Sequence, residues 1–350
     1  MFKKKSLITA VSFLSAVSLF TGCSSANTST SESSASEVSV STAESSNIPE
    51  SEPFSVVCTI FPEYDWVKEI LGSHAENVEI SYLLDNGVDL HNYQPTADDI
   101  VKISSCDLFV YVGGESDEWV EDALAEAANK DMKVINLMDF LGDSAKVEEL
   151  KEGMQESEHE EEHEHEHEEG EVEYDEHVWL SLKNAKVLCA EIEKNIEAID
   201  SANAADYKAN LDSYVAKLDE LDNSFKTLVD GSSVKTLVFG DRFPFRYFVD
   251  DYGIDYFAAF IGCSAESEAS FETIKFLSDK INELDCKTIF TIENSVKDIA
   301  EAVISNSGKT DVTIAELNSL QSVSNADISS GTTYLSLMQK NYDVLADILK

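Results

Sequence analysis

The sequence predicts an α/β fold with two lobes, each containing a parallel sheet flanked by helices and joined to the other by a long helix. Short apolar runs alternate with helix-like stretches in two separate batches. Such alternation is typical of parallel sheets covered on both faces. Between the batches, one long amphipathic pattern predicts a single extended helix.

Four apolar runs in the first batch are predicted strands, at residues 55–61, 78–84, 108–113 and 133–138. Predicted helices lie between them, near residues 63–71, 96–105 and 117–129. The second batch has predicted strands at residues 236–240, 254–260, 288–292 and 312–317. Its predicted helices lie near residues 245–252, 268–284, 296–306 and 333–349.

The long amphipathic pattern connects the two batches. Apolar residues recur at three- and four-residue spacing from Leu211 to Leu228, which places them on one face of a helix. We expect this helix to span residues 204–229, with Ser201 or Asn203 as N-cap. Its length of about 39 Å, at 1.5 Å per residue, is enough to cross from one lobe to the other. An ordinary helix within one lobe is the alternative.

The N-terminus carries features of an exported chain. Three lysines (residues 3–5) precede an apolar stretch that ends at Phe20, followed by Gly22 and Cys23. This stretch is shorter than the roughly 20 residues of a membrane span and suits a secretory signal. Residues 1–22 with Cys23 resemble a bacterial lipoprotein signal, in which the cysteine is lipidated. An ordinary cleaved signal is the alternative.

Residues 23–53 contain mainly Ser, Thr, Ala and Glu, which predicts a disordered tether. We therefore expect an extracytoplasmic chain that is lipid-anchored to the cell membrane.

The formal net charge of −43 excludes a nucleic-acid partner and favours cations. Besides Cys23, five cysteines are scattered through the chain without a CxxC pair, and we expect most of them to be small buried hydrophobic residues. These are Cys58, Cys106, Cys189, Cys263 and Cys286.

All seven histidines lie within the first 177 residues, and four of them are in one tract, EHEEEHEHEHEE, at residues 158–169. Imidazole and carboxylate are common ligands of divalent cations. A Glu-rich tract alone would be interpreted as a solvated linker. The tract histidines instead predict an accessory metal-collecting loop: His159, His163, His165 and His167.

Further candidate ligands follow predicted strands, where open parallel sheets place their ligand sites. His91 follows the strand at 78–84, and His177 follows the tract. Asp241 directly follows the strand at 236–240, and Glu293 directly follows the strand at 288–292. Each acid also has a structural alternative, because Asp241 could pair with Arg242 and Glu293 could cap a helix.

Two segments carry a family resemblance. LHNYQPTADDIVKISSCDLFVYVG (residues 90–113) and DEHVWLSLKNA (residues 175–185) resemble the two metal-histidine motifs of zinc and manganese substrate-binding proteins of bacterial ABC importers. The resemblance covers residues 54–350. It implies a class III periplasmic-binding-protein-like fold, with one ion held between the lobes, and the His/acid-rich loop is typical of the zinc branch.

The resemblance implies that His91 and His177 are the two histidine ligands of the N-terminal lobe. At the third ligand position, FGDRFPFRYF offers Asp241 or Arg242, and we predict Asp241 because a guanidinium stays protonated. Glu293 and Asn318 are less favoured candidates. The second lobe has no histidine, so its ligand is an oxygen or, as a less favoured choice, the sulfur of Cys263.

These observations predict a protein that captures extracellular Zn²⁺, with Mn²⁺ as the alternative ion, and delivers it to an ABC permease and its ATPase. We expect a monomer and no enzymatic activity. A zinc hydrolase and a surface zinc buffer or adhesin are remote alternatives; no HExxH pair supports the former. The predicted boundaries are residues 1–22 (signal), 23–53 (tether), 54–182 (N-terminal lobe, including the loop 155–173), 183–232 (linking helices) and 233–350 (C-terminal lobe).

Overall fold

A computed structural model describes residues 53–155, 173–264 and 268–350. The predicted signal, Cys23, nearly all of the predicted tether and the four tract histidines lie outside these residues. The described residues belong to one compact unit, Ile48–Lys350. No helix among them is both long and apolar enough to cross a membrane. Below, residues 54–182 are called the N-lobe and residues 233–350 the C-lobe.

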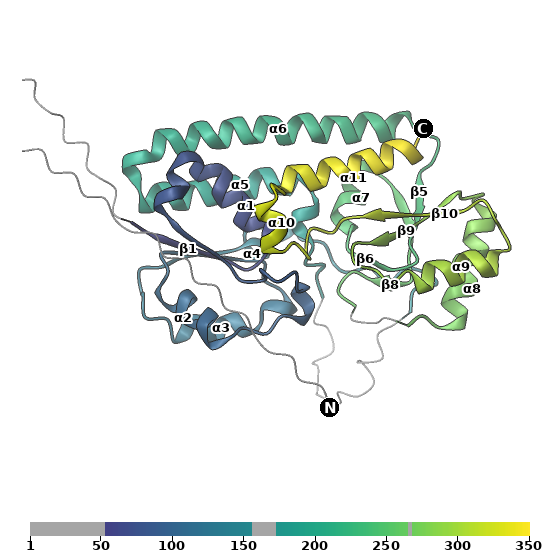
Figure 1. The fold of residues 1–350 in the computed structure, drawn as a ribbon, viewed down its shortest axis with the longest axis horizontal. Coiled ribbons are helices and arrows are strands. Elements are labelled where there is room, and N and C mark those ends of the chain that lie inside the picture. Colours follow the sequence, from purple (N-terminus) through teal and green to yellow (C-terminus); the bar gives the residue numbers. More distant parts are fainter. Residues whose placement is uncertain (1–52, 156–172, 265–267) are drawn as a thin grey trace, which may run out of the picture. The chain divides into compact units, whose positions relative to one another are not determined.

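The N-lobe contains a parallel sheet that includes β1, labelled in Figure 1, and its strand order is β2-β1-β3-β4. Its strands are β1 (Ser55–Cys58), β2 (Glu79–Tyr82), β3 (Leu108–Tyr111) and β4 (Lys133–Asn136). The accompanying helices are α1 (Phe61–Leu71), α2 (Ala97–Ser105), α3 (Trp119–Ala125) and α4 (Leu137–Leu141). All four strand predictions are confirmed, with each strand ending two or three residues earlier than expected.

Local sequence explains where α2 begins. Thr96 and Asp99 form a capping box, in which each side chain accepts a hydrogen bond from the other residue's backbone N–H. The segment between β2 and α2 thereby has a fixed end just after His91.

The C-lobe sheet consists of short parallel pairs. β5 (Thr236–Val238) pairs with β7 (Asp255–Phe257), and β9 (Thr288–Ile292) pairs with β10 (Thr313–Leu317). A parallel bridge between Phe239 and Phe290 connects β5 to β9. A further pair contains β6 (Arg242–Phe243) and β8 (Phe260–Ile261).

The predicted strand at 254–260 is wrong as a single strand, because it divides into β7 and β8. Ala259 between them donates its N–H to Asp241 O and accepts a hydrogen bond from Gln155 N. At Ala259 the backbone therefore changes its pairing partner, because β7 pairs with β5 whereas β8 pairs with β6.

Helices α7 (Arg246–Tyr252), α8 (Phe271–Glu283), α9 (Asp298–Ser307) and α11 (Tyr334–Ile348) confirm the predicted helices of the second batch to within three residues at each end. A short helix, α10 (Asn325–Ser329), was not predicted.

The long helix is α6, Ala204–Gly231, and it follows α5, Leu182–Ile199. Figure 1 shows α6 running past both groups of strands, and it contacts α1 and α5 at one end and α7 and α11 at the other. Asn210 donates to Ile70 O, whereas the Phe225 ring packs on Phe248, Tyr252 and Tyr342. The prediction of a helix that contacts both lobes is confirmed.

Direct contacts also join the lobes behind this helix. Trp179 Nε1 donates to Ser319 O at 2.9 Å, and Tyr334 Oη donates to Trp179 O at 2.7 Å. One buried apolar cluster continues from N-lobe strands to α11. A shared core therefore connects the two lobes whose strands carry the loops described below.

Candidate metal centre

His91 lies in the loop that leaves β2. Its backbone N–H donates to Asp89 Oδ1 at 3.1 Å, and the neighbouring Leu90 is buried, so the loop is fixed directly before the imidazole. The ring nitrogen Nδ1 lies 2.8 Å from Ser116 Oγ and 3.4 Å from Glu176 Oε2. These contacts leave Nε2 as the ring nitrogen available to a ligand.

His177 is completely buried. Asp175 Oδ1 accepts a hydrogen bond from the backbone N–H of His177 at 2.8 Å. The same oxygen lies 3.0 Å from the ring Nδ1 of His177 and accepts its proton in a second hydrogen bond. The carboxylate of Asp175 therefore fixes the orientation and the tautomer of this ring, with the proton on Nδ1.

The two imidazoles face each other, with their Nε2 atoms 3.2 Å apart. A carboxylate can only accept, so Glu176 and Asp175 favour the Nδ1–H tautomer in both rings. Each Nε2 then presents a lone pair to the other, an arrangement that a cation bound between them would stabilise. Tetrahedral zinc with Zn–N bonds of about 2.0–2.1 Å separates two nitrogen ligands by about 3.3 Å.

Glu176 was not among the predicted site residues. The loop that follows β3 leaves room for the Glu176 side chain beside His91. In this loop Gly114 has φ +81°, and a Cβ at this position would lie 2.4 Å from Glu176 Oε1. Ser116 N donates to the same oxygen at 2.8 Å. Burial acts to raise the pKa of Glu176, but hydrogen bonds from His91 and Ser116 outweigh it and lower the pKa. The signal in the sequence was the acidic pair directly before His177.

The C-lobe contributes Cys263 to this cluster. The ligand atoms of His91, His177 and Cys263 all lie within 4.8 Å of one another, the one such group among the described residues. Gly262 permits the approach, because a Cβ at this position would lie 2.9 Å from His177 Cε1 and 3.0 Å from Phe243 O.

Asp241 lies after β5, as expected, but outside this three-residue group. Its carboxylate accepts hydrogen bonds from Arg242 N at 2.9 Å and Ile292 N at 3.3 Å. Arg242 forms an ion pair with Asp89 of the N-lobe. In this conformation Asp241 binds backbone N–H groups of its own lobe, and its predicted role as a ligand stays a prediction.

The two less favoured candidates lie together at a different place. Glu293 accepts hydrogen bonds from Ser319 N at 2.7 Å and Ser319 Oγ at 2.6 Å, and Asn318 accepts one from Leu320 N at 2.9 Å. Both line a polar pocket of about 490 Å³. Neither residue belongs to the His91, His177 and Cys263 group, the one possible metal-binding group among the described residues.

The electrostatics of the centre favour a cation. Burial raises the pKa of Asp175, Asp117 and Glu148 to about 7 each. Burial also lowers the pKa of His177 well below its usual value, and the positive charge of Arg242 acts in the same direction. Near neutral pH, His177 is an uncharged imidazole surrounded by acids, as metal binding requires.

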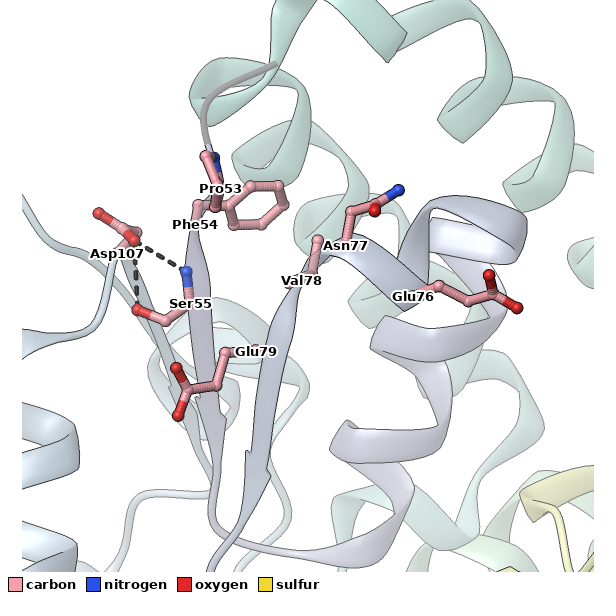
Figure 2. A pocket seen from close by; sticks show the side chains of 8 residues that line it. All are labelled: Pro53, Phe54, Ser55, Glu76, Asn77, Val78, Glu79 and Asp107. Carbon is pink, nitrogen blue, oxygen red and sulfur yellow. Dashed lines mark hydrogen bonds between the residues drawn. The ribbon is translucent and has the colours of Figure 1, made fainter. Parts of the chain in front are cut away.

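Another pocket, of about 470 Å³, lies at the opposite end of the N-lobe strands. Figure 2 shows it at the amino ends of β1 and β2, where Asp107 accepts hydrogen bonds from the backbone N–H and the hydroxyl of Ser55. It contains no histidine or cysteine. Among the described residues, the one group of possible metal ligands does not include its carboxylates.

Both flanks of the collecting loop lie within the described residues. On one side Gln155 N donates to Ala259 O at 2.9 Å, and on the other Glu148 N donates to Glu173 O at 3.0 Å. Glu148 also accepts a hydrogen bond from Cys263 N at 3.4 Å. The loop therefore leaves and re-enters the fold beside the segment that carries Cys263.

Comparison with known proteins gives the same assignment of fold and family. Residues 56–348 match the family described as ZnuA, zinc-uptake complex component A, periplasmic. The chain is 30% identical over 295 residues to the high-affinity zinc uptake system protein ZnuA of Bacillus subtilis, covering 84% of this chain and 87% of that protein.

Other matches include a longer relative and a solved structure. The zinc-binding protein AdcA of Streptococcus pyogenes is 27% identical over 302 residues, covering 83% of this chain, which spans 55% of the length of that relative. The Zn(II)-bound ZnuA-like domain of Streptococcus pneumoniae AdcA superposes with a TM-score of 0.65 at 25% identity, covering 85% of this chain and 99% of the domain.

Proposed function

The chain belongs to the ZnuA family of zinc-uptake components, and from this premise we propose that it captures Zn²⁺ outside the cytoplasm and passes it to an ABC permease and its ATPase. His91 and His177 hold the ion from the N-lobe. Asp241 remains the ligand that the sequence predicts for the C-lobe. The chain binds and releases its cargo without chemical change, in keeping with a family of transport components and not of enzymes.

The observation that carries this proposal is the pair of facing Nε2 atoms 3.2 Å apart, each on a ring whose Nδ1 faces a carboxylate. Carboxylate–histidine–metal arrangements of this kind fix the tautomer and make the imidazole a stronger ligand. A core histidine without a ligand needs hydrogen-bond partners for its ring nitrogens, not a second lone pair opposite one of them.

The collecting loop and the lipid anchor complete the proposal. Four histidines among eight glutamates at residues 158–169 would bind several ions weakly and raise the local zinc concentration. Because both flanks of this loop contact the strands and loops around Cys263, captured ions would be released near the centre. Lipidation at Cys23 would keep the chain at the membrane beside its permease, and the pneumococcal relative is named a zinc-binding lipoprotein.

Metal accumulation in cells tests the proposal. Deletion of the gene is expected to lower cellular zinc when external zinc is scarce, without changing cellular manganese. The wild-type chain should restore zinc, and a His91→Ala, His177→Ala double variant should not. A loss of manganese instead would assign the chain to manganese uptake, and unchanged contents of both metals would indicate a surface buffer or adhesin.

A further inference from the structure

We propose that the thiolate of Cys263 is the ligand that the C-lobe supplies to the transported ion, completing a His-His-Cys site selective for zinc over manganese. This inference rests on the proposed function. It starts from the position of Cys263 in the three-residue group, where its Sγ lies within 4.8 Å of a ligand nitrogen on each histidine.

The distances suit zinc after a small adjustment. Zn–N bonds of about 2.0–2.1 Å and a Zn–S bond of about 2.3 Å, at tetrahedral angles, place sulfur about 3.6 Å from each nitrogen. The two nitrogens already have the required spacing, at 3.2 Å. The sulfur therefore needs to approach the nitrogens by at most about 1 Å, within the reach of a side-chain rotation.

The backbone is built to bring this loop to the histidines. Gly262 lies against the His177 ring so closely that a Cβ would approach Cε1 to 2.9 Å. On the other side of Cys263 the buried Ser264 anchors the loop, and Glu148 accepts a hydrogen bond from Cys263 N. A loop with no role at the centre would not need a glycine in contact with a buried imidazole.

The competing groups of the C-lobe are already engaged. Asp241 accepts two backbone hydrogen bonds, and the Arg242 guanidinium binds Asp89, so both side chains already have partners in this conformation. The sulfur of Cys263 contacts the Glu148 side chain and the Glu176 backbone N–H, and it lies within 4.8 Å of a ligand nitrogen on each histidine.

Binding would break the S–H bond and form a Zn–S bond, and the proton would pass to solvent. Thiolate is a soft ligand that favours zinc, whereas manganese favours oxygen. A sulfur ligand would therefore discriminate between the two ions that the histidines alone accept.

Cobalt(II) spectroscopy on the full chain tests this assignment. One equivalent of Co²⁺ is expected to give an intense thiolate-to-metal charge-transfer band, which the collecting loop cannot produce because it contains no cysteine. Cys263→Ser should abolish the band and lower zinc affinity by at least roughly 100-fold, above the range found for outer groups alone. Manganese affinity should change little. Cys286→Ser, which removes another half-buried cysteine of the C-lobe, is the matched control and should keep the band.

Two outcomes would overturn the proposal. If Co²⁺ binds in a His91-dependent way without a charge-transfer band, Cys263 is not a ligand while the proposed function survives. If Asp241→Asn abolishes tight zinc binding and Cys263→Ser does not, the C-lobe ligand is Asp241. Failure of the wild-type chain to bind one zinc ion tightly would instead remove the proposed function itself.

Discussion

The Nε2 atoms of His91 and His177 lie 3.2 Å apart, although 86 residues separate the two histidines in the chain. The loops after β2 and before α5 meet because both are fixed by carboxylates, Asp89 at the first and Asp175 at the second. The N-lobe therefore presents a preorganised pair of ligands, and zinc binding there costs little conformational entropy.

Glu176→Gln is expected to lower zinc affinity by roughly 10- to 100-fold, the range found for residues that orient a metal ligand. Glutamine fills the same space, but its amide N–H₂ can face His91 Nδ1–H, where Glu176 Oε2 lies 3.4 Å away. Competition with a zinc chelator measures the effect. Glu193→Gln, which changes a buried carboxylate on α5, is the matched control and should bind zinc as the wild type does.

Deletion of residues 158–169 should lower the number of bound zinc ions while one tight site remains, because His91 and His177 lie outside the deleted segment. Isothermal titration calorimetry gives both the stoichiometry and the affinity. If the deletion removed the tight site, the collecting loop would be the principal binding site and the assignment to His91 and His177 would be wrong.

Asp65→Asn should change how stability depends on pH. Burial raises the pKa of Asp65 to about 7, above its ordinary value of 3.8, although Tyr334 N donates to it at 2.8 Å. Between pH 4 and 7 the folded state therefore holds a proton that the unfolded state has lost, so this group makes the free energy of unfolding fall as pH rises. The effect reaches about 4 kcal/mol at most, at 1.36 kcal/mol per pKa unit.

Urea denaturation of the metal-free protein at pH 5 and pH 7 measures this effect. The wild type should lose more stability than Asp65→Asn over this interval, and the difference should become constant only well above pH 7, where Asp65 is ionised in both states. Equal losses in the two proteins would show that Asp65 has no raised pKa.

Phe225→Ala should destabilise the fold by about 3–5 kcal/mol, because its completely buried ring contacts aromatic residues of α7 and α11. Chemical denaturation checks the value. Phe271→Ala, at a side chain that is 68% exposed, is the control and should change stability by less than about 0.5 kcal/mol. A similar small effect at Phe225 would contradict the role of α6 as a helix packed against the C-lobe.

Most of the fold could be predicted because its signals are local. β9 has the predicted bounds, residues 288–292, and α6 begins at the predicted Ala204 because one apolar face continues along it. The break between β7 and β8 could not be predicted, since Ala259 is redirected by Asp241 and Gln155, which are distant in the sequence. Apolar composition alone does not record such contacts.

The centre was predictable to a smaller extent. The sequence motifs point to His91 and His177, and the structure brings both together. The role of Glu176 depends on Gly114 and Ser116, about 60 residues earlier in the chain. The closeness of Cys263 depends on a loop from the other lobe and on the space left by Gly262. The spacing of residues along the sequence does not predict that Glu176 contacts His91 or that Cys263 lies near the two histidines.

Zinc affinity of the single-histidine variants, measured on the full chain against a competing chelator, is the most direct test of the central claim. His91→Ala and His177→Ala should each lose the tight site, with affinity lowered by at least roughly 100-fold, because each removes one of the ligands that zinc requires. His74→Ala, which changes a histidine paired with Asp206 on α6, should keep wild-type affinity. Wild-type affinity in either of the first two variants would contradict the account.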